Sequence, residues 1–382
     1  MGIALTDDHR ELAEVARGFL TAQKARWAAR SLLDASDEPR PAFWQNLVEL
    51  GWLGLHVDEE YGGSGFGLPE LVVVVEELGR AVAPGPFVPT VIVSAVIAKD
   101  GTAEQKSRLL PGLIDGTVVA GVGLGGQVQV NDGVADGEAG IVLGAGLAEL
   151  LLIAAGDDVL LLERGRDGVS VEVPENLDPT RRSGRVRLQN VRVSDDDVVA
   201  GAQPSALARA RTLLAAEAVG GATDCVEAAV DYAKVRQQFG RTIATFQAVK
   251  HHCANMVVAS ESATAAVWDA SRAASEDEEQ FRLIAAVAAA QAFPAYARNS
   301  ELNIQVHGGI GFTWEHDAHL HLRRALVTTA LFGGDAPAAD VFERSAAGAV
   351  RENSLDLPPE AEELRTRIHA DAAQIAALDK QA

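Results

Sequence analysis

The chain has 382 residues, 48% of them hydrophobic, and contains only two cysteines. At roughly 150 residues per domain, this length provides two or three structural units with a large core, which excludes a small disulfide-stapled scaffold. Its 54 acidic and 33 basic side chains give a formal net charge of -21, which opposes binding to nucleic acids and anionic lipids. The first residues show no signal-peptide pattern, and the most apolar stretch, residues 141–155, is too short to cross a bilayer. We therefore expect a soluble cytoplasmic protein.

Helical periodicity dominates residues 1–115, which we predict to form an N-terminal helical domain. Thr6 is the predicted N-cap of the first helix, because acidic residues follow it directly and apolar residues then recur at helical spacing. The last helix of this domain is predicted to end before Pro111. The predicted helices span residues 6–28, 41–50, 68–83, 88–99 and 103–110.

Short β-branched or leucine-rich runs follow, separated by Gly, Asp, Asn and Pro. This spacing predicts a small antiparallel β domain over residues 116–202. The runs that contain the predicted strands are residues 118–130, 140–154, 159–163, 169–173 and 185–193.

Long alanine-rich helical patterns then predict an antiparallel four-helix bundle over residues 203–350, which makes the fold class α+β. Residues 351–382 are predicted to be a charged tail, in which the Leu and Glu spacing of residues 357–364 repeats that of residues 5–12. An exposed terminal helix is the preferred interpretation of this repeat, and the remnant of a second, similar module is the alternative. The predicted bundle helices span residues 205–234, 243–275, 278–306 and 335–351.

Five motifs lie in a defined order along the chain. They are Gly51-Trp-Leu-Gly-Leu-His-Val-Asp-Glu-Glu-Tyr-Gly-Gly-Ser-Gly65, Glu77-Leu-Gly-Arg80, Gln105-Lys106 with Leu110-Pro111, Arg236-Gln-Gln-Phe-Gly-Arg241 with Phe246-Gln247, and Gln305-Val-His-Gly-Gly-Ile-Gly-Phe312. In this order and spacing they resemble the acyl-CoA dehydrogenase family over about residues 5–345. The resemblance implies that family's succession of helices, sheet and bundle, together with an FAD cofactor. Its members oxidise the Cα–Cβ bond of an acyl-CoA thioester: a carboxylate removes the α proton while the flavin takes the β hydride.

The resemblance also implies a group of residues that holds the ADP half of an FAD bound by the neighbouring subunit. A pyrophosphate needs cationic donors, and glycines where the backbone approaches it closely. Taken alone, Arg236 can be explained as a solvated helix-end arginine, and the turn after residue 307 as a plain helix C-cap. The joint spacing favours cofactor binding. The residues implied are Arg236, Gln238, Phe239, Gln247, Gln305, Gly308 and Gly309.

The two segments that hold the flavin ring in the family are not matched. Residues 123–130, Gly-Leu-Gly-Gly-Gln-Val-Gln-Val, lack the hydroxyl, proline and acid of the family's Thr-Glu-Pro-Gly-Ala-Gly-Ser-Asp-like loop. Residues 144–149 contain neither Trp nor Thr where the family has a Trp-Ile-Thr-Asn-like strand. Because both sets of ring contacts are missing, we expect that this chain's own β domain does not seat a flavin ring.

The family's catalytic base is missing as well. Gly333 and Ala210 occupy the two positions that the family uses for the carboxylate, and neither can take a proton. Asp335, two positions after Gly333, is expected to be a helix N-cap. Glu217 is a candidate base if burial raises its pKa, although a structural acid paired inside the bundle is the preferred interpretation. Arg211 matches a family arginine that lines the active cavity, with a surface ion pair as the alternative.

The histidines near the end of the bundle invite a metal-site interpretation. His316, His319 and His321 lie close in sequence, but no cysteine or regular acid pattern joins them to complete a ligand set. We expect no metal site.

A preserved ADP site combined with a lost ring site and a lost base predicts a division of labour between subunits. We expect the noncatalytic subunit of an α2β2 acyl-CoA dehydrogenase, which contributes the ADP-binding half of an interfacial FAD site to a paralogous catalytic partner. The pattern resembles the degenerate subunit of actinobacterial heterotetrameric enzymes that dehydrogenate steroid side-chain CoA thioesters, and electron-transfer flavoprotein is the acceptor that this resemblance implies. Two alternatives remain: a complete homo-oligomeric dehydrogenase with a displaced base, and a flavin-free scaffold or acyl-CoA-binding protein.

Overall fold

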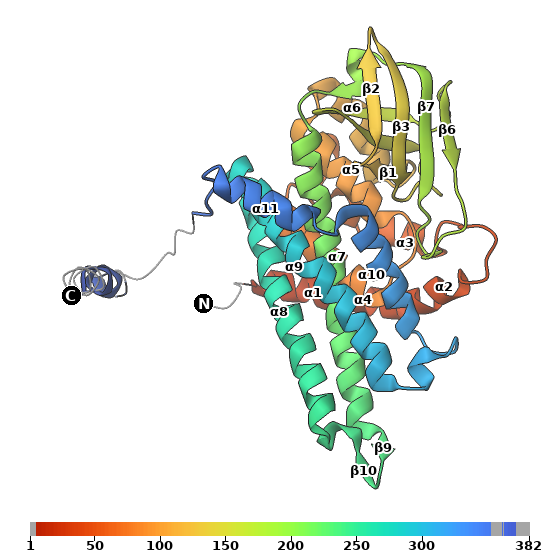
Figure 1. The fold of residues 1–382 in the computed structure, drawn as a ribbon. Coiled ribbons are helices and arrows are strands. Elements are labelled where there is room, and N and C mark those ends of the chain that lie inside the picture. Colours follow the sequence, from red (N-terminus) through yellow and green to blue (C-terminus); the bar gives the residue numbers. More distant parts are fainter. Residues whose placement is uncertain (1–4, 353–360, 362, 372–382) are drawn as a thin grey trace. The chain divides into compact units, whose positions relative to one another are not determined.

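The computed structural model describes residues 5–352, 361 and 363–371. Met1–Ala349 belong to one compact unit and Val350–Ala382 to a second. Helices, two β-sheets and a long helical bundle follow one another in the first unit (Figure 1). This order confirms the predicted α+β class, while the domain boundaries at residues 115, 202 and 350 stay predictions. Most of the segment 357–364, with its repeat-like spacing, lies outside the described residues.

Among the N-terminal helices, α5 lies in the core, since every residue from Phe87 to Ile97 is buried. Thr6 caps the first helix as predicted, since its Oγ1 accepts the backbone N–H of His9 at 3.2 Å. The single helix predicted over residues 6–28 is wrong, because the chain turns at Lys24, where φ is 52°. The predicted stop before Pro111 is also wrong, since the sixth helix continues to Ile114. The elements are α1 (Asp7–Ala22), α2 (Ala25–Ser31), α3 (Trp44–Glu49), η1 (Trp52–Gly54), η2 (Glu59–Tyr61), α4 (Leu68–Ala81), α5 (Phe87–Asp100) and α6 (Ala103–Ile114).

Helix α4 crosses the first bundle helix, α7 (Gln203–Val235), at two glycines. A Cβ atom on Gly79 would overlap the carbonyl oxygen of Glu217, and one on Gly220 would overlap the carbonyl oxygen of Glu76. Only glycine therefore permits this backbone-to-backbone approach, which joins the N-terminal helices to the bundle.

Within residues 5–352, two four-stranded sheets pack against each other over a common apolar core that includes Ala139, Ile153 and Leu188. One sheet has the order β1-β4-β5-β8 and the other the order β2-β3-β7-β6. β1 and β4 run parallel, with Ala120 opposite Leu150, so the predicted antiparallel arrangement is wrong for this pair. The strands are β1 (Ala120–Gly123), β2 (Gln127–Asn131), β3 (Val134–Val142), β4 (Leu150–Ala155), β5 (Asp158–Glu163), β6 (Val169–Glu172), β7 (Gly184–Arg192) and β8 (Val198–Val199).

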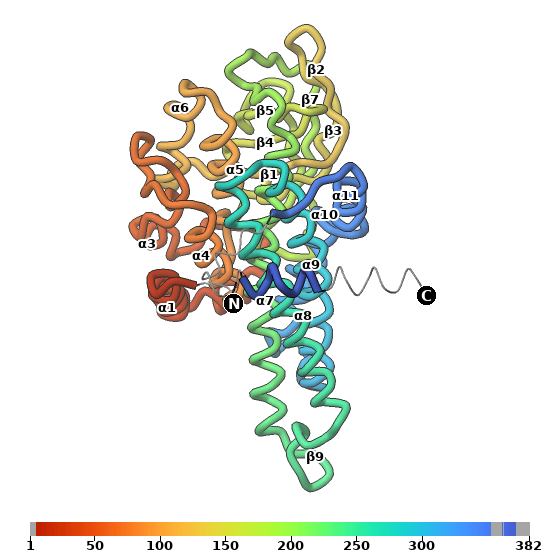
Figure 2. Tube along the Cα trace, turned by 90° about the vertical axis from the view of Figure 1, so that its left-hand side faces the viewer, coloured from red at the N-terminus to blue at the C-terminus, as the bar shows by residue number. Residues whose placement is uncertain are grey.

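The bundle is built on the long helices α7, α8 and α9. A short hairpin, β9–β10, joins α7 to α8 at the end of the bundle farthest from the sheets (Figure 2). Helix α10 lies where no helix was predicted, and α11 is shorter than the predicted helix over residues 335–351. None of the described helices combines the length and apolarity needed to cross a membrane. The elements are β9 (Gln237–Gln238), β10 (Arg241–Thr242), η4 (Ile243–Thr245), α8 (Gln247–Glu276), α9 (Glu278–His307), η5 (Ile310–Phe312), α10 (Ala318–Phe332) and α11 (Ala336–Ala346).

Candidate cofactor and substrate site

Four of the residues implied in ADP binding surround the hairpin at the far end of the bundle. Arg236 is the C-cap of α7, and Gln238 lies in β9. Phe239 is 91% exposed and has a positive φ of 53°, so the hairpin turn presents its ring to solvent. Gln247 is the first residue of α8 and is exposed. The turn thus places a cation, two amides and an aromatic ring on one open surface.

The other three residues end helix α9. The backbone N–H of Gly308 donates to the carbonyl of Ile304 at 3.1 Å, and its φ of 63° ends the helix as a glycine C-cap does. A Cβ atom on Gly308 or on Gly309 would meet nothing within 4 Å, so the backbone here is open to a ligand. Gln305 is exposed on the last turn.

The two groups lie at the same end of the bundle because His307 of α9 stacks on Tyr232 of α7 with ring centroids 4.3 Å apart. Tyr232 precedes Arg236 by one helical turn.

These residues fit the ADP half of FAD. The exposed side chain of Arg236 forms neither an ion pair nor a hydrogen bond within the described part of the chain. An unpaired guanidinium in a protein of net charge -21 is suited to bind phosphate oxygens. The adjacent N-terminus of the 30-residue helix α8 adds unpaired N–H groups and the positive end of a helix dipole.

The positions that correspond to the ring half do not fit a flavin. Only Leu124, Gly125 and Gly126 join β1 to β2, and none carries a hydroxyl or an acid. A Cβ atom on Gly126 would overlap the backbone of Ala139, so the chain itself occupies the space beside this glycine. In the second segment, Gly144 has a φ of 77° and lies against the ring of Pro89. The turns at residues 124–126 and 144–147 therefore offer a flavin ring no side-chain hydroxyl or acid.

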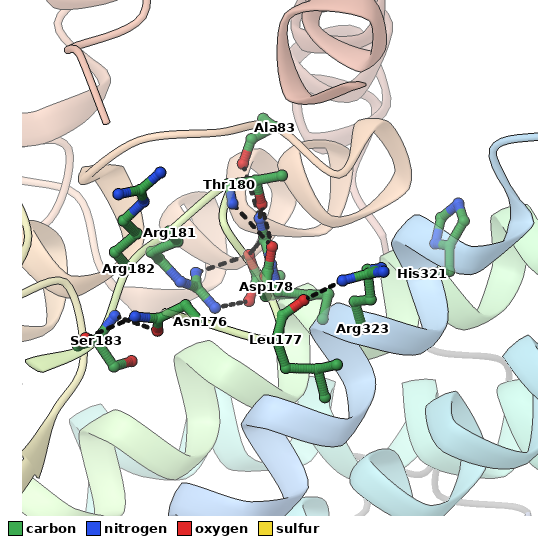
Figure 3. Close-up of polar contacts among 12 residues, drawn as sticks. Ala83, Asn176, Leu177, Asp178, Thr180, Arg181, Arg182, Ser183, His321 and Arg323 are labelled. Atoms are coloured by element: carbon green, nitrogen blue, oxygen red, sulfur yellow. Dashed lines mark hydrogen bonds and ion pairs between the residues drawn. The ribbon is translucent and has the colours of Figure 1, made fainter. Parts of the chain in front are cut away.

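A buried ionic cluster joins the loop after β6 to the bundle (Figure 3). Glu217 of α7 accepts two hydrogen bonds of 2.8 Å from Arg181 of the loop and one of 2.6 Å from Arg324 of α10. Arg324 also donates to Asp178 and to Thr180 of the same loop. The side chains of Glu217, Arg181 and Arg324 are all at most 2% exposed. The cluster therefore fixes the loop against two bundle helices.

The two arginines determine the protonation state of Glu217. Burial alone would raise the pKa of its carboxyl, but the charges of Arg181 and Arg324 outweigh burial and lower the pKa below its ordinary value. The raised pKa expected of a base at this position is therefore not found. The preferred interpretation, a structural acid paired inside the bundle, is confirmed by the ion pairs.

No other carboxylate replaces the missing base at the expected positions. Ala210 is fully buried in α7. Gly333 ends α10, and a Cβ atom there would lie 2.9 Å from the carbonyl oxygen of Thr329, so a larger side chain would require the backbone to move. Asp335 occupies the predicted N-cap position of α11, but its exposed side chain makes no capping hydrogen bond.

Arg211 is 5% exposed, so it does not lie on the surface, but the ion pair with an acidic residue that the alternative expected is present. Its Nη1 pairs with Asp340 of α11, and Asp340 also accepts a 2.7 Å hydrogen bond from Nε of Arg344. The charge of Arg211 is thus already paired within the chain. Asp340 was not predicted from the sequence, because this contact joins residues 129 positions apart.

The histidines after α9 have separate structural partners. His319 stacks on Trp314 with ring centroids 4.8 Å apart. His321 lies between Tyr296 and Asp224, with a ring nitrogen 3.0 Å from an oxygen of each. Among the described residues, no three His, Cys, Asp or Glu side chains gather as a possible metal-ligand set.

Asp178, Arg181 and Arg324 were not predicted from the sequence either. Two arginine pairs, Arg181-Arg182 in a loop and Arg323-Arg324 in α10, were the available signal. An arginine that must be buried needs a carboxylate nearby, so each pair could have been matched with Glu217.

Two family models match the chain. The acyl-CoA dehydrogenase N-terminal domain matches residues 6–117, and the acyl-CoA dehydrogenase C-terminal domain matches residues 201–346.

Individual proteins give the same result. Acyl-CoA dehydrogenase FadE34 of Mycobacterium tuberculosis is 37% identical over 394 residues, which cover 100% of this chain and 54% of that protein, so the chain spans about half the length of this relative. Acyl-CoA dehydrogenase IpdE2 of the same species is 33% identical over 320 residues, covering 83% of this chain and 91% of that protein. Among solved structures, a variant of the Tcur3481–Tcur3483 steroid ACAD superimposes with a TM-score of 0.82 and 28% identity, covering 90% of this chain and 98% of the matched chain.

Proposed function

Because this chain belongs to the acyl-CoA dehydrogenase family, we propose that it is one subunit of a heteromeric, FAD-dependent acyl-CoA dehydrogenase of the cytoplasm. In an α2β2 assembly, it contributes the ADP-binding half of an interfacial FAD site. A paralogous subunit contributes the bed for the flavin ring and the catalytic base.

The observation that carries the proposal is an unpaired cation on an open surface that also exposes aromatic rings. Arg236 is exposed without a partner among the described residues, next to Phe239, which is 91% exposed. Phe312, which follows the Gly308-Gly309 turn, is 88% exposed. Aromatic side chains with such exposure favour burial against another chain and its cofactor.

The rest of the site supports a noncatalytic role. Ala210 and Gly333 provide no carboxylate, and Glu217 is ionised and held by Arg181 and Arg324. A complete homo-oligomeric dehydrogenase would need a base that none of these positions supplies.

This chain's residues would act by binding. When bound, FAD supplies the ring that accepts the hydride from the substrate. The guanidinium of Arg236 would donate charge-assisted hydrogen bonds to the phosphate oxygens, and the free N–H groups near Gln247 would add to the same positive field. Gly308 and Gly309 have no Cβ atoms, so their backbone can lie directly against the dinucleotide, with the amide of Gln305 beside it.

For the substrate, we propose a CoA thioester with a steroid-derived acyl group. The support is the 28% identity to a solved steroid ACAD that covers 90% of this chain. Electron-transfer flavoprotein is the proposed electron acceptor.

Coexpression with a paralogous acyl-CoA dehydrogenase that retains both ring motifs and the base tests the proposal. We expect a complex with one FAD per pair of subunits, measured by native mass and visible flavin absorbance. Arg236→Ala should weaken FAD binding by about tenfold to a hundredfold, as expected for the loss of charged hydrogen bonds. Lys234→Ala removes a neighbouring cation that pairs with Asp231 at 3.5 Å and should leave FAD in place.

Two results would contradict the proposal. One is a homotetramer of this chain alone that is replete with flavin and active on an acyl-CoA. The other is a stable complex that holds no flavin and is unaffected by Arg236→Ala, which would instead favour a scaffold.

A further inference from the structure

A cavity of about 320 Å³ lies on the face of α7 that is turned away from Arg211. Arg209 lines it, and at about 100° per residue the side chains of Arg209 and Arg211 leave the helix in nearly opposite directions. The cavity is therefore separate from the side of α7 that the family resemblance assigns to the active cavity. Its volume lies at the lower end of the range for small-molecule sites, roughly 300–1,000 Å³.

Arg209 brings a buried positive charge to this cavity. The residue is 3% exposed, and its guanidinium packs over the ring of Phe281 at 5.1 Å. All its hydrogen bonds to described residues start from Nη1, which donates to Ser205 and, at 3.4 Å, to Glu278. Nε and Nη2 have no such partner and are not among the fully buried atoms, so they remain available as donors. The charge is only partly paired, since Glu278 is 29% exposed and also faces Arg282.

His56 brings the opposite property, an unpaired acceptor. Its Nε2 lies 3.0 Å from Oγ of Ser94, and that hydroxyl donates its own proton to the carbonyl of Val91. Nε2 therefore carries the imidazole proton and donates it to Ser94, which leaves a lone pair on Nδ1. Nδ1 is buried and has no partner among the described residues. Burial, together with the charge of Arg209, lowers the pKa of His56 to about 3, so the ring stays neutral.

The remaining walls define the size and polarity of a ligand. Phe66, Ala95 and Ala98 supply apolar surface. The exposed side chains of Lys99 and Asp58 at the rim carry opposite charges, so the partly paired Arg209 is the cation that a ligand inside the cavity meets. Together with the apolar walls, this favours a small anion with an apolar part.

We propose that this cavity binds a small organic carboxylate that also carries a hydroxyl group, with the carboxylate on Arg209 and the hydroxyl donating to Nδ1 of His56. The ligand's carboxylate and hydroxyl thus each bind a polar group that lacks a full set of partners within the protein. The ligand's carbon chain contacts Phe66 and the alanines of α5. A buried acceptor without a partner is costly, which is the physical reason for a preference for the hydroxyl. The inference is independent of the proposed FAD site.

Three probes of similar size separate these contributions: 3-hydroxybutyrate has both groups, butyrate lacks the hydroxyl, and 1,3-butanediol lacks the carboxylate. Binding to the full chain, with its partner where the two copurify, is titrated by saturation-transfer NMR. We expect saturable binding of 3-hydroxybutyrate, about tenfold weaker binding of butyrate and no saturable binding of the diol.

Variants locate the binding. Arg209→Met should weaken 3-hydroxybutyrate at least about tenfold, while Arg209→Lys, which keeps the charge, should recover part of that loss. His56→Phe should reduce 3-hydroxybutyrate to the affinity of butyrate and leave butyrate unchanged. Arg108→Met is the control, because Arg108 is an exposed cation of α6 outside this cavity that binds the carbonyl of Asp196 at 2.8 Å.

The proposal is overturned if the unmodified chain binds no probe, which would mean that water alone fills the cavity, or if it binds all three equally. It is also overturned if the preference for the hydroxyl survives His56→Phe. Should Arg209→Met fail to fold, as judged by its melting temperature, the three probes on the unmodified chain and on His56→Phe still decide the question.

Discussion

The imidazole ring of His307 stacks on the phenol ring of Tyr232, with centroids 4.3 Å apart and planes inclined by 26°. Tyr232 lies one turn before Arg236 in α7, and His307 immediately precedes Gly308 at the end of α9. The ring pair therefore sets the spacing between the two elements that carry the proposed ADP-binding residues.

Replacing the ring of Tyr232 should weaken FAD binding without removing any residue that is proposed to contact FAD. A stacked aromatic pair contributes about 0.5–1.5 kcal/mol, so Tyr232→Leu is expected to speed FAD release from the coexpressed complex by roughly twofold to tenfold. Tyr232→Phe keeps the ring and should release FAD at the unmodified rate. The measurement is the rate of flavin dissociation, with the melting temperature recorded for each variant. Equal rates for both variants would show that the stack does not position the site.

Glu217 is expected to act on stability. Glu217→Ala leaves Arg181 and Arg324 buried without their shared carboxylate, and breaking a buried ion pair in this way costs about 3–5 kcal/mol. Removing Arg181 as well should cost less than the sum of the two single changes, because one buried charge then disappears with its partner. Urea denaturation gives the free energy of unfolding of the two single variants and of the double variant. If Glu217→Gln instead left stability intact and abolished turnover of an acyl-CoA by the complex, Glu217 would be a base after all.

Local patterns in the sequence predicted those features that depend on neighbouring residues. Helices α7, α8 and α9 follow from apolar spacing alone, and the ADP-binding group follows from motif spacing around Arg236 and Gly308. Helix α10 was missed because its apolar positions alternate with His and Arg, and the break at Lys24 because nothing in its neighbours requires a left-handed residue.

Features that depend on distant residues could not be predicted in this way. The parallel pairing of Ala120 with Leu150 is set by how two strands meet in space. The contacts from Glu217 to Arg181 and Arg324 span 36 and 107 positions. Composition indicated only that a glutamate in an apolar helix needs a partner; the fold supplied two arginines, which reversed the expected direction of its pKa shift.

Glu76 should make the protein less stable as the pH rises. Burial raises the pKa of Glu76 to about 8, with Glu77 adding to the rise, and its Oε1 is buried without a partner. The folded state thus keeps a proton that the unfolded chain releases near the ordinary value of 4.5. The stability contributed by this group is complete below the unfolded pKa and is lost as the pH rises through about 8.

The variant that tests this is Glu76→Gln, which keeps the shape of the side chain and cannot ionise. At pH 8 it should be more stable than the unmodified chain by roughly 4 kcal/mol, and at pH 4.5 the two should be nearly equal. The comparison is between unfolding free energies at each pH, so the contributions of other groups, including Glu38 with its pKa raised to about 7, cancel. A difference that does not change with pH would refute the assignment to Glu76.

The crossing of α4 and α7 predicts opposite effects for the same substitution at two helical glycines. Gly79→Ala places a methyl group against the carbonyl of Glu217, and the forced separation of the two helices should cost about 1–3 kcal/mol despite the better helix propensity of alanine. Gly18 of α1 is the matched control: it is exposed, a Cβ atom there meets nothing within 4 Å, and Gly18→Ala should stabilise the protein by about 0.5–1 kcal/mol. Urea denaturation of both variants measures the difference. If Gly79→Ala proved as stabilising as Gly18→Ala, the two helices would not be held at the close approach that the glycines permit.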